Sequence, residues 1–194
     1  MQWVKGPPAG EDLGEGLEMM MPPLAGPALA NIMQVAWVTP DLERSIEQFR
    51  TIYRVPEFFV MDTEFEADVF GERGTMKLRL ALANVDNIQL ELIQPIGGGV
   101  DRLYRDVLPA DGSHANVFHH VCVKVLGTLE DWEAHVATLG GPDRPVAYVG
   151  YMGDAAKFCY TDERAAIGMY VEHVWFSPET EARMAAVVPT YRTI

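Results

Sequence analysis

Four polar side chains in this sequence belong to residue types that bind metal ions: Gln34, Glu91, His120 and Glu172. Each stands among aliphatic neighbours in a segment that alternates apolar and polar residues, the pattern of a β-strand with one buried face. One imidazole and three oxygen donors, two of them anionic, suit Zn²⁺, Ni²⁺, Co²⁺, Mn²⁺ or Mg²⁺. Because a buried carboxylate without a partner is costly, we predict that the four residues converge on one divalent metal ion per site.

Such a centre would do carbonyl chemistry. A substrate with two adjacent oxygens could chelate the ion, which would stabilise the enolate formed when a C–H beside the carbonyl loses its proton. Isomerisation, epimerisation and a lyase step can all pass through that intermediate. We therefore predict a small-molecule carbonyl substrate.

The strand over residues 118–125 positions the histidine. Val121 and Val123 alternate with His120 and Cys122, which places the two pairs on opposite faces. A single histidine beside an apolar run is also typical of a hydrogen-bonded structural residue, and this reading stays open. By the same alternation, the adjacent His119 should face away from His120.

The order of elements around that strand occurs twice in the chain. Strands are expected at 32–38, 58–61, 75–82 and 88–93, with a helix capped by Thr39 and Pro40 after the first strand. The second set has strands at 118–125, 146–148, 156–160 and 168–175, with a helix opened by Thr128. Ser177 and Pro178 then open a closing helix. The offset from Gln34 to His120 nearly equals that from Glu91 to Glu172, which indicates a structural repeat.

The predicted fold class is α+β, with two βαβββ modules whose sheets form one cup and whose helices pack on its outer face. We expect one structural domain, divided into a flexible N-terminal arm (1–30), a first module (31–97), a connector (98–116), a second module (117–176) and a C-terminal helix (177–194). Glycine and proline are frequent in the arm, which excludes a long helix there. An alternative is that the arm packs over a neighbouring subunit or a pocket mouth.

Composition excludes several classes of partner. The 194-residue chain is 48% hydrophobic, enough for a globular core, and its net charge of −13 repels nucleic acid and anionic membrane surfaces. No segment approaches the roughly 20 apolar residues of a membrane span. Two cysteines are too few for a disulfide framework. We expect a cytoplasmic protein with reduced thiols and neither nucleic-acid nor membrane partners.

Four segments resemble the paired-module signatures of the vicinal oxygen chelate superfamily: QVAWVTPDLERSIEQF, IQLELIQP, FHHVCVKV and MYVEHVWF. This superfamily includes glyoxalase I, methylmalonyl-CoA epimerase, extradiol dioxygenases and bleomycin-resistance proteins. The resemblance covers about residues 32 to 176 and implies a U-shaped cup of mixed sheet and a homodimer. It also implies metal ligands at Gln34, Glu91, His120 and Glu172.

The resemblance narrows the reaction without identifying it. The ligand set is similar to that of eukaryotic glyoxalase I, whereas the connector is closer to the methylmalonyl-CoA epimerase-like branch. By resemblance, Glu172 would leave the metal and act as the base, and Glu91 would be the second catalytic carboxylate. We expect Cys122, Phe158 and Tyr160 to bind the substrate as pocket walls.

Three functions remain open. The first is a metal-dependent isomerase, epimerase or lyase. The second is a non-catalytic, drug-sequestering binding protein of the same fold, although such a protein would not need four convergent ligand-type residues. The third is a ring-cleaving dioxygenase, which requires two histidines and one carboxylate around Fe(II), so Gln34 argues against it.

Overall fold

The computed structural model describes residues 29–192, so almost all of the predicted arm lies outside the described residues. The first half contains β1 (Ile32–Val38), α1 (Leu42–Ile52), β2 (Phe59–Val69), β3 (Glu72–Val85), β4 (Ile88–Gly97) and α2 (Arg102–Arg105). The second half contains β5 (Val117–Lys124), α3 (Leu129–Val136), β6 (Val146–Tyr151), β7 (Ala156–Asp162), α4 (Arg164–Ile167), β8 (Tyr170–Phe176), α5 (Pro178–Val187) and β9 (Thr190–Tyr191). The order strand, helix, strand, strand, strand occurs twice, apart from the short α4. No helix within residues 29–192 is both long and apolar enough to cross a membrane.

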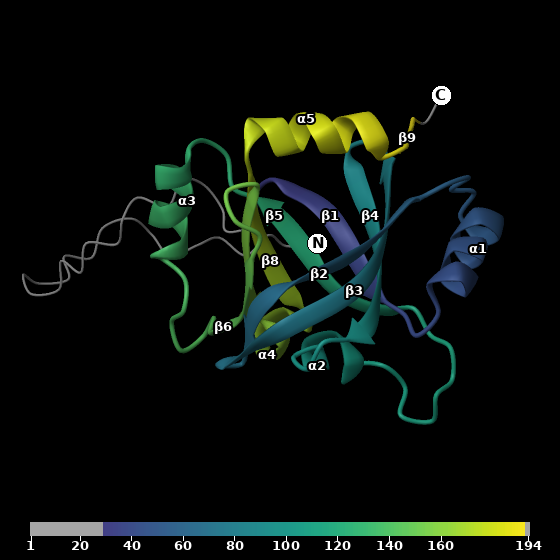
Figure 1. Cartoon of the computed structure of the whole chain (residues 1–194), viewed down its shortest axis with the longest axis horizontal. Coiled ribbons are helices and arrows are strands. Elements are labelled where there is room, and N and C mark those ends of the chain that lie inside the picture. The colour runs from purple at the N-terminus through teal and green to yellow at the C-terminus, as the bar shows by residue number, and fades with distance from the viewer. Residues whose placement is uncertain (1–28, 193–194) are drawn as a thin grey trace, which may run out of the picture.

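All the strands belong to one mixed sheet, which confirms the predicted α+β class. The strand order is β2-β6-β7-β8-β5-β1-β4-β3-β9, and β2 also pairs with β3. Strands β1 and β4 run parallel, as do β5 and β8, and the antiparallel pair β1–β5 joins the two modules. Because β2 contacts both β3 and β6, the sheet curls round and closes the cup (Figure 1).

Strands β2 and β3 are longer than the segments 58–61 and 75–82 that the pattern predicts. They pair in register from Phe59 and Leu82 to Val69 and Glu72. The turn uses Phe70 and Gly71, both at positive φ, as a two-residue turn of type I′ requires. Most of β2 alternates between intermediate and exposed positions, so its apolar signal is weak. The end of this hairpin that carries the turn pairs with β6.

Helices cover the outside of the sheet. Leu42 and Phe49 of α1 pack on Ala81 and Leu92, whereas Trp132 of α3 packs in a separate cluster around Val125, Cys159 and Trp175. Figure 1 shows α1 and α3 at opposite sides of the sheet, α5 across one end and α2 near the other end. The interior of the cup is therefore enclosed by the sheet and by α2 and α5.

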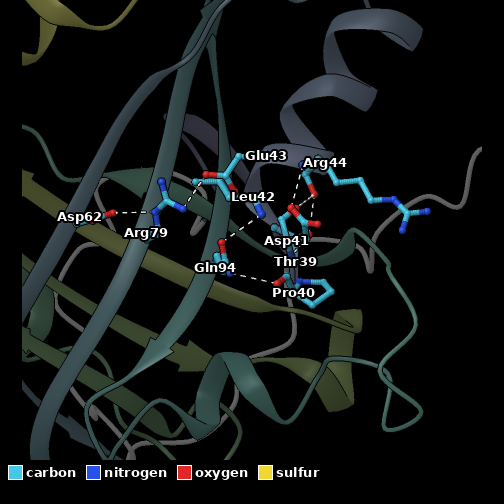
Figure 2. A network of polar contacts seen from close by, with 10 residues as sticks. Thr39, Pro40, Asp41, Leu42, Glu43, Arg44, Asp62, Arg79 and Gln94 are labelled. Atoms are coloured by element: carbon cyan, nitrogen blue, oxygen red, sulfur yellow. Dashed lines mark hydrogen bonds and ion pairs between the residues drawn. The ribbon is translucent and has the colours of Figure 1, made fainter.

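The predicted start of α1 at Thr39 and Pro40 was wrong. The N–H of Thr39 donates to the carbonyl of Ile93 (2.8 Å), so strand pairing continues through this residue. The helix begins two residues later, where the Asp41 carboxylate accepts from the N–H of Arg44 (3.0 Å). Figure 2 shows Gln94 of β4 fastening this end, since it accepts from the N–H of Leu42 and donates to the carbonyl of Pro40, both at 3.1 Å.

The other two predicted helix starts are confirmed. Thr128 and Asp131 form a capping box at α3, and Ser177 caps α5 with Pro178 in its first turn. Helix α3 ends at Val136. After α5, the short strand β9 pairs with the end of β3, an element that the sequence did not indicate.

Candidate metal centre

Strand register brings the polar interior residues into two neighbouring rows. Cross-strand pairs connect one row of six residues from both modules: Tyr148, Tyr160, Glu172, Cys122, Gln34 and Gln89. In the next row, Ala36 of β1 lies between Glu91 of β4 and His120 of β5. Because alanine is small, the two long side chains that flank it have room to approach each other.

Glu91, His120 and Glu172 come together in the structure. The Nε2 atom of His120 lies 3.1 Å from an oxygen of Glu172 and 3.5 Å from an oxygen of Glu91. One donor atom from each residue falls within 4.8 Å of the others. All three side chains are buried, and they come from strands of both modules.

The charges of this triad are strongly coupled. Burial opposes the charged form of His120, but its hydrogen bonds with Glu172 and Glu91 outweigh burial and raise its pKa to about 9. Burial raises the pKa of Glu91, an effect that His120 partly offsets. One imidazole facing two buried carboxylates is a donor set that fits a divalent cation, because the cation would balance the two negative charges.

His119 is not turned away from the site as alternation suggested. Its Nδ1 atom lies 3.0 Å from Nδ1 of His120, and its Nε2 atom lies 3.1 Å from the carbonyl of Leu103. A carbonyl only accepts, so His119 Nε2 carries a proton and, in the neutral ring, Nδ1 is the acceptor. Burial, and then the neighbouring His120, lower the pKa of His119 to about 3, so the ring is neutral. His120 therefore donates from Nδ1 and directs Nε2 at the two carboxylates.

Gln34 also lies in the cavity wall, where its amide nitrogen donates to the amide oxygen of Gln89 (2.7 Å). This bond orients the Gln34 amide and leaves its oxygen as the atom available to a cation. Gln89 was not predicted from the sequence as a site residue. It lies two residues before Glu91 on β4, however, and so faces the same side of the strand.

A cavity of about 170 Å³ opens beside the triad. Its wall includes the predicted pocket residues Cys122, Phe158 and Tyr160, together with Gln34, Glu91 and Glu172. The rest is largely apolar, with contributions from β2, β3 and α5 that the sequence did not indicate, among them Met61, Leu80 and Met184. Burial raises the pKa of Cys122 well above its ordinary value, so this thiol is a wall group and not a nucleophile.

Three buried tyrosines form a cluster that contacts His120 through Tyr160. The Tyr104 hydroxyl donates to the Tyr160 hydroxyl (2.9 Å), which lies 3.3 Å from Nε2 of His120. Tyr148 packs edge-on against Tyr160, with ring centroids 4.9 Å apart. Tyr104 and Tyr148 were both missed from the sequence. Tyr104 lies in α2 of the connector, and Tyr148 lies on the short strand β6.

His173 lies on the opposite face of β8 from Glu172, because successive residues of a strand alternate in direction. Its ring nitrogens contact Nε2 of His135 (3.0 Å) and the Thr161 hydroxyl (3.3 Å), beneath α3. The two histidines next to the triad ligands thus differ: His119 contacts the site, and His173 belongs to the outer layer.

Several solved structures are similar to this chain in fold. A variant methylmalonyl-CoA epimerase of Streptomyces coelicolor in complex with 2-nitronate-propionyl-CoA is 17% identical, with a TM-score of 0.49 over 76% of this chain and 95% of that chain. The methylmalonyl-CoA epimerase of Mycobacterium tuberculosis is 14% identical, with a TM-score of 0.46 over 78% and 91%. A hypothetical protein of Bacillus halodurans is 10% identical, with a TM-score of 0.45 over 75% and 94%. No curated protein matches the chain by sequence.

A protein-family model also matches this chain, over a large part of its sequence. The model described as glyoxalase/bleomycin resistance protein/dioxygenase superfamily matches residues 33–160, about two thirds of the chain. The match spans β1 to β7, including three of the four predicted ligands, and Glu172 lies twelve residues beyond its end. The chain therefore belongs to the glyoxalase/bleomycin resistance protein/dioxygenase superfamily, whose fold is the vicinal oxygen chelate fold.

Proposed function

We propose that this protein is a metal-dependent isomerase, epimerase or glyoxalase-type lyase acting on a small carbonyl compound with adjacent oxygens. The observation that carries the proposal is the buried convergence of Glu91, His120 and Glu172 on one side of an apolar cavity. Two carboxylates in such a place destabilise the fold unless a cation or a substrate compensates them. A site selected for stability alone would favour apolar residues there.

Glu91, His120 and Glu172 would hold the divalent ion, with the Gln34 amide oxygen as the fourth donor. Bound there, a divalent ion supplies Lewis acidity, which lowers the free energy of an enolate relative to the carbonyl compound. Glu172 takes the proton from the carbon beside the carbonyl while the C–H electron pair moves toward the carbonyl oxygen. Return of the proton to the opposite face of that carbon gives an epimer, and its return to the neighbouring carbon gives an isomer.

The surrounding side chains support this proton transfer. The apolar wall, with Met33, Phe158 and Leu80, keeps bulk water from the carbanionic carbon and strengthens the electrostatic interactions inside the cavity. His120 holds Glu172 within reach of the cavity by the contact described above. Glu91 is the second carboxylate available for proton return.

The second candidate function is ligand sequestration without catalysis. The mostly apolar cavity wall favours it, because flexible methionines such as Met61 and Met152 adapt to varied ligands. The homodimer and the cytoplasmic location stay predictions, and sedimentation analysis would test the dimer.

Metal content tests the proposal. Protein purified without chelator or metal-affinity resin should carry about one divalent ion per chain, and Glu172→Gln and His120→Ala should both lose it. Glu64→Gln is the matched control, because Glu64 is an exposed carboxylate on β2 that pairs with Lys77. Loaded wild-type protein should then exchange substrate protons with deuterated water among 2-oxo acids, 2-oxoaldehydes or acyl thioesters.

Wild-type protein that contains no metal and takes up none of Ni²⁺, Zn²⁺, Co²⁺ or Mn²⁺ would contradict the enzymatic proposal. Tight binding of apolar ligands by that metal-free protein would then support sequestration.

A further inference from the structure

One buried polar group in the cavity has no partner. Tyr148 is 1% exposed, and its hydroxyl makes no hydrogen bond to any of residues 29–192. A buried hydroxyl without a partner loses its hydration and gains nothing in return, so such groups are uncommon unless they serve a ligand. Tyr148 also lines the cavity, next to Tyr160 and Phe158.

The neighbouring phenols do not satisfy Tyr148. The ring centroid of Tyr104 lies 6.2 Å from that of Tyr148, and Tyr104 offsets part of the rise in the Tyr148 pKa that burial causes. However, its own hydroxyl proton is given to Tyr160, and no bond of acceptable distance and angle forms between Tyr104 and Tyr148. Tyr160 in turn faces His120. Of the three phenols, Tyr148 is the one whose hydroxyl makes no hydrogen bond within residues 29–192.

The position of Tyr148 relates it to the triad. It lies opposite Tyr160, which lies opposite Glu172, so its ring belongs to the same interior row as the proposed base. Burial, and then the negative charge of Glu172, raise its pKa well above the ordinary value. The phenol therefore stays protonated and acts as a donor, not as a second base.

We propose that the Tyr148 hydroxyl donates a hydrogen bond to an oxygen of the substrate on which negative charge develops. The inference rests on the proposed function and adds to it that the substrate presents an anionic or enolisable oxygen toward β6 as well as toward the triad. A donor already fixed in a cavity of low polarity stabilises a developing oxyanion without reorganising. Tyr148 is thus a catalytic residue distinct from the triad.

Tyr148→Phe tests this with a binding probe and a stability measurement. The probe is oxalate, a planar dianion with adjacent oxygens, titrated into Co²⁺-loaded protein and followed by the cobalt absorption spectrum. We expect Tyr148→Phe to bind oxalate about tenfold more weakly or worse, the effect of removing a hydrogen bond to a charged oxygen. The ligand-free variant should melt at the wild-type temperature or above it, because the lost hydroxyl had no partner.

Tyr151→Phe is the matched control. Tyr151 lies on the same strand, but its hydroxyl donates to Asp68 (2.6 Å) at the surface. It should leave oxalate affinity unchanged. A lower melting temperature of Tyr148→Phe with unchanged oxalate affinity would overturn the inference, since the hydroxyl would then have a structural partner such as a bound water.

The remaining outcomes separate this inference from the proposed function. If wild-type protein takes up cobalt but binds oxalate no better than Tyr148→Phe, or not at all, the Tyr148 inference is wrong and the metal-dependent function stands. If wild-type protein takes up no cobalt or other divalent ion, the proposed function is wrong, and the Tyr148 inference, which depends on it, is wrong as well.

Discussion

At the scale of single residues, the function of the centre depends on which nitrogen of His120 faces the carboxylates. The carbonyl of Leu103 determines the tautomer of His119, and His119 determines that of His120. Hydrogen-bond partners of this kind commonly orient metal-binding histidines. His119, which would not bind the metal itself, thereby leaves Nε2 of His120 as the ligand atom.

We predict that His119→Phe weakens divalent-metal binding by about 10- to 100-fold, the usual effect of losing such a partner. Phenylalanine retains the stacking of this ring on Tyr170 but leaves Nδ1 of His120 without its acceptor. His119→Gln, which restores an acceptor, should lose less affinity. Competition with a chromogenic chelator measures the affinity.

His114→Phe is the control for that substitution, because His114 contacts Gln48 on the outside of the sheet. Equal metal affinity in His119→Phe and wild-type protein would show that the hydrogen bond from His120 to His119 does not affect metal binding.

At the scale of elements, the start of α1 gives a direct test of the revised cap. Asp41→Ala should lower the free energy of unfolding by about 1 kcal/mol, because the N–H of Arg44 loses its acceptor. Asp41→Asn keeps an oxygen in the same place and should cost less. Urea unfolding compares the three proteins, and an Asp41→Ala variant as stable as wild type would be incompatible with this cap.

The layer under α3 predicts how acid affects stability. Burial, and then the nearby His135 and Arg144, lower the pKa of His173 to about 3. Thr161 contacts His173 and also donates a hydrogen bond to Glu163, which forms an ion pair with Arg144. Protonating His173 therefore requires disrupting a neutral, buried contact.

The unfolded chain takes up that proton near pH 6.5 and the folded chain only near pH 3, so the unfolded state binds more protons between these values. Stability from this group is complete above pH 6.5 and falls by up to about 1.4 kcal/mol per pH unit below it. We predict that His173→Gln reduces the loss of stability between pH 7 and pH 5, measured by urea unfolding of metal-free protein. Parallel pH profiles of the two proteins would contradict this account.

At the scale of the whole molecule, the net charge of −13 repels an anionic ligand, whereas an arginine of the cavity wall attracts it. The far field repels anions, whereas Arg183 of α5 is the only basic side chain among the described residues that line the cavity. Helix α5 lies across the end of the sheet in Figure 1, and Arg183 is an exposed residue of this helix.

We predict that Arg183→Gln weakens the binding of anilinonaphthalene sulfonate, an apolar anion, by about two- to fivefold at low salt, as expected for an exposed charge. The loss should shrink as salt increases, because mobile ions screen the guanidinium. Fluorescence titration measures it, with Arg44→Gln on the outer helix α1 as control. A loss that does not depend on salt would indicate a packing role for Arg183 instead.

Residue types and their alternation determined much of this protein. Period-two patterns and helix caps predicted the two βαβββ modules, because side-chain direction along a strand depends only on local backbone geometry. The same rule placed Gln34, Glu91, His120 and Glu172 on interior faces. It failed at His119, because the register of β5 against β1 shifts between His120 and Phe118, which leaves His119 as an extra residue and breaks the alternation.

Tertiary structure decided the rest, because it depends on contacts between residues far apart in the chain. The closure of the sheet by β2 and β6 and the bond from Gln34 to Gln89 follow from strand register, which no single segment encodes. The arrival of Tyr104 from the connector beside His119 and Tyr160, and the unpartnered hydroxyl of Tyr148, likewise exist only once the modules meet. Local sequence determined which groups face the interior, and the closed sheet decided which of them touch.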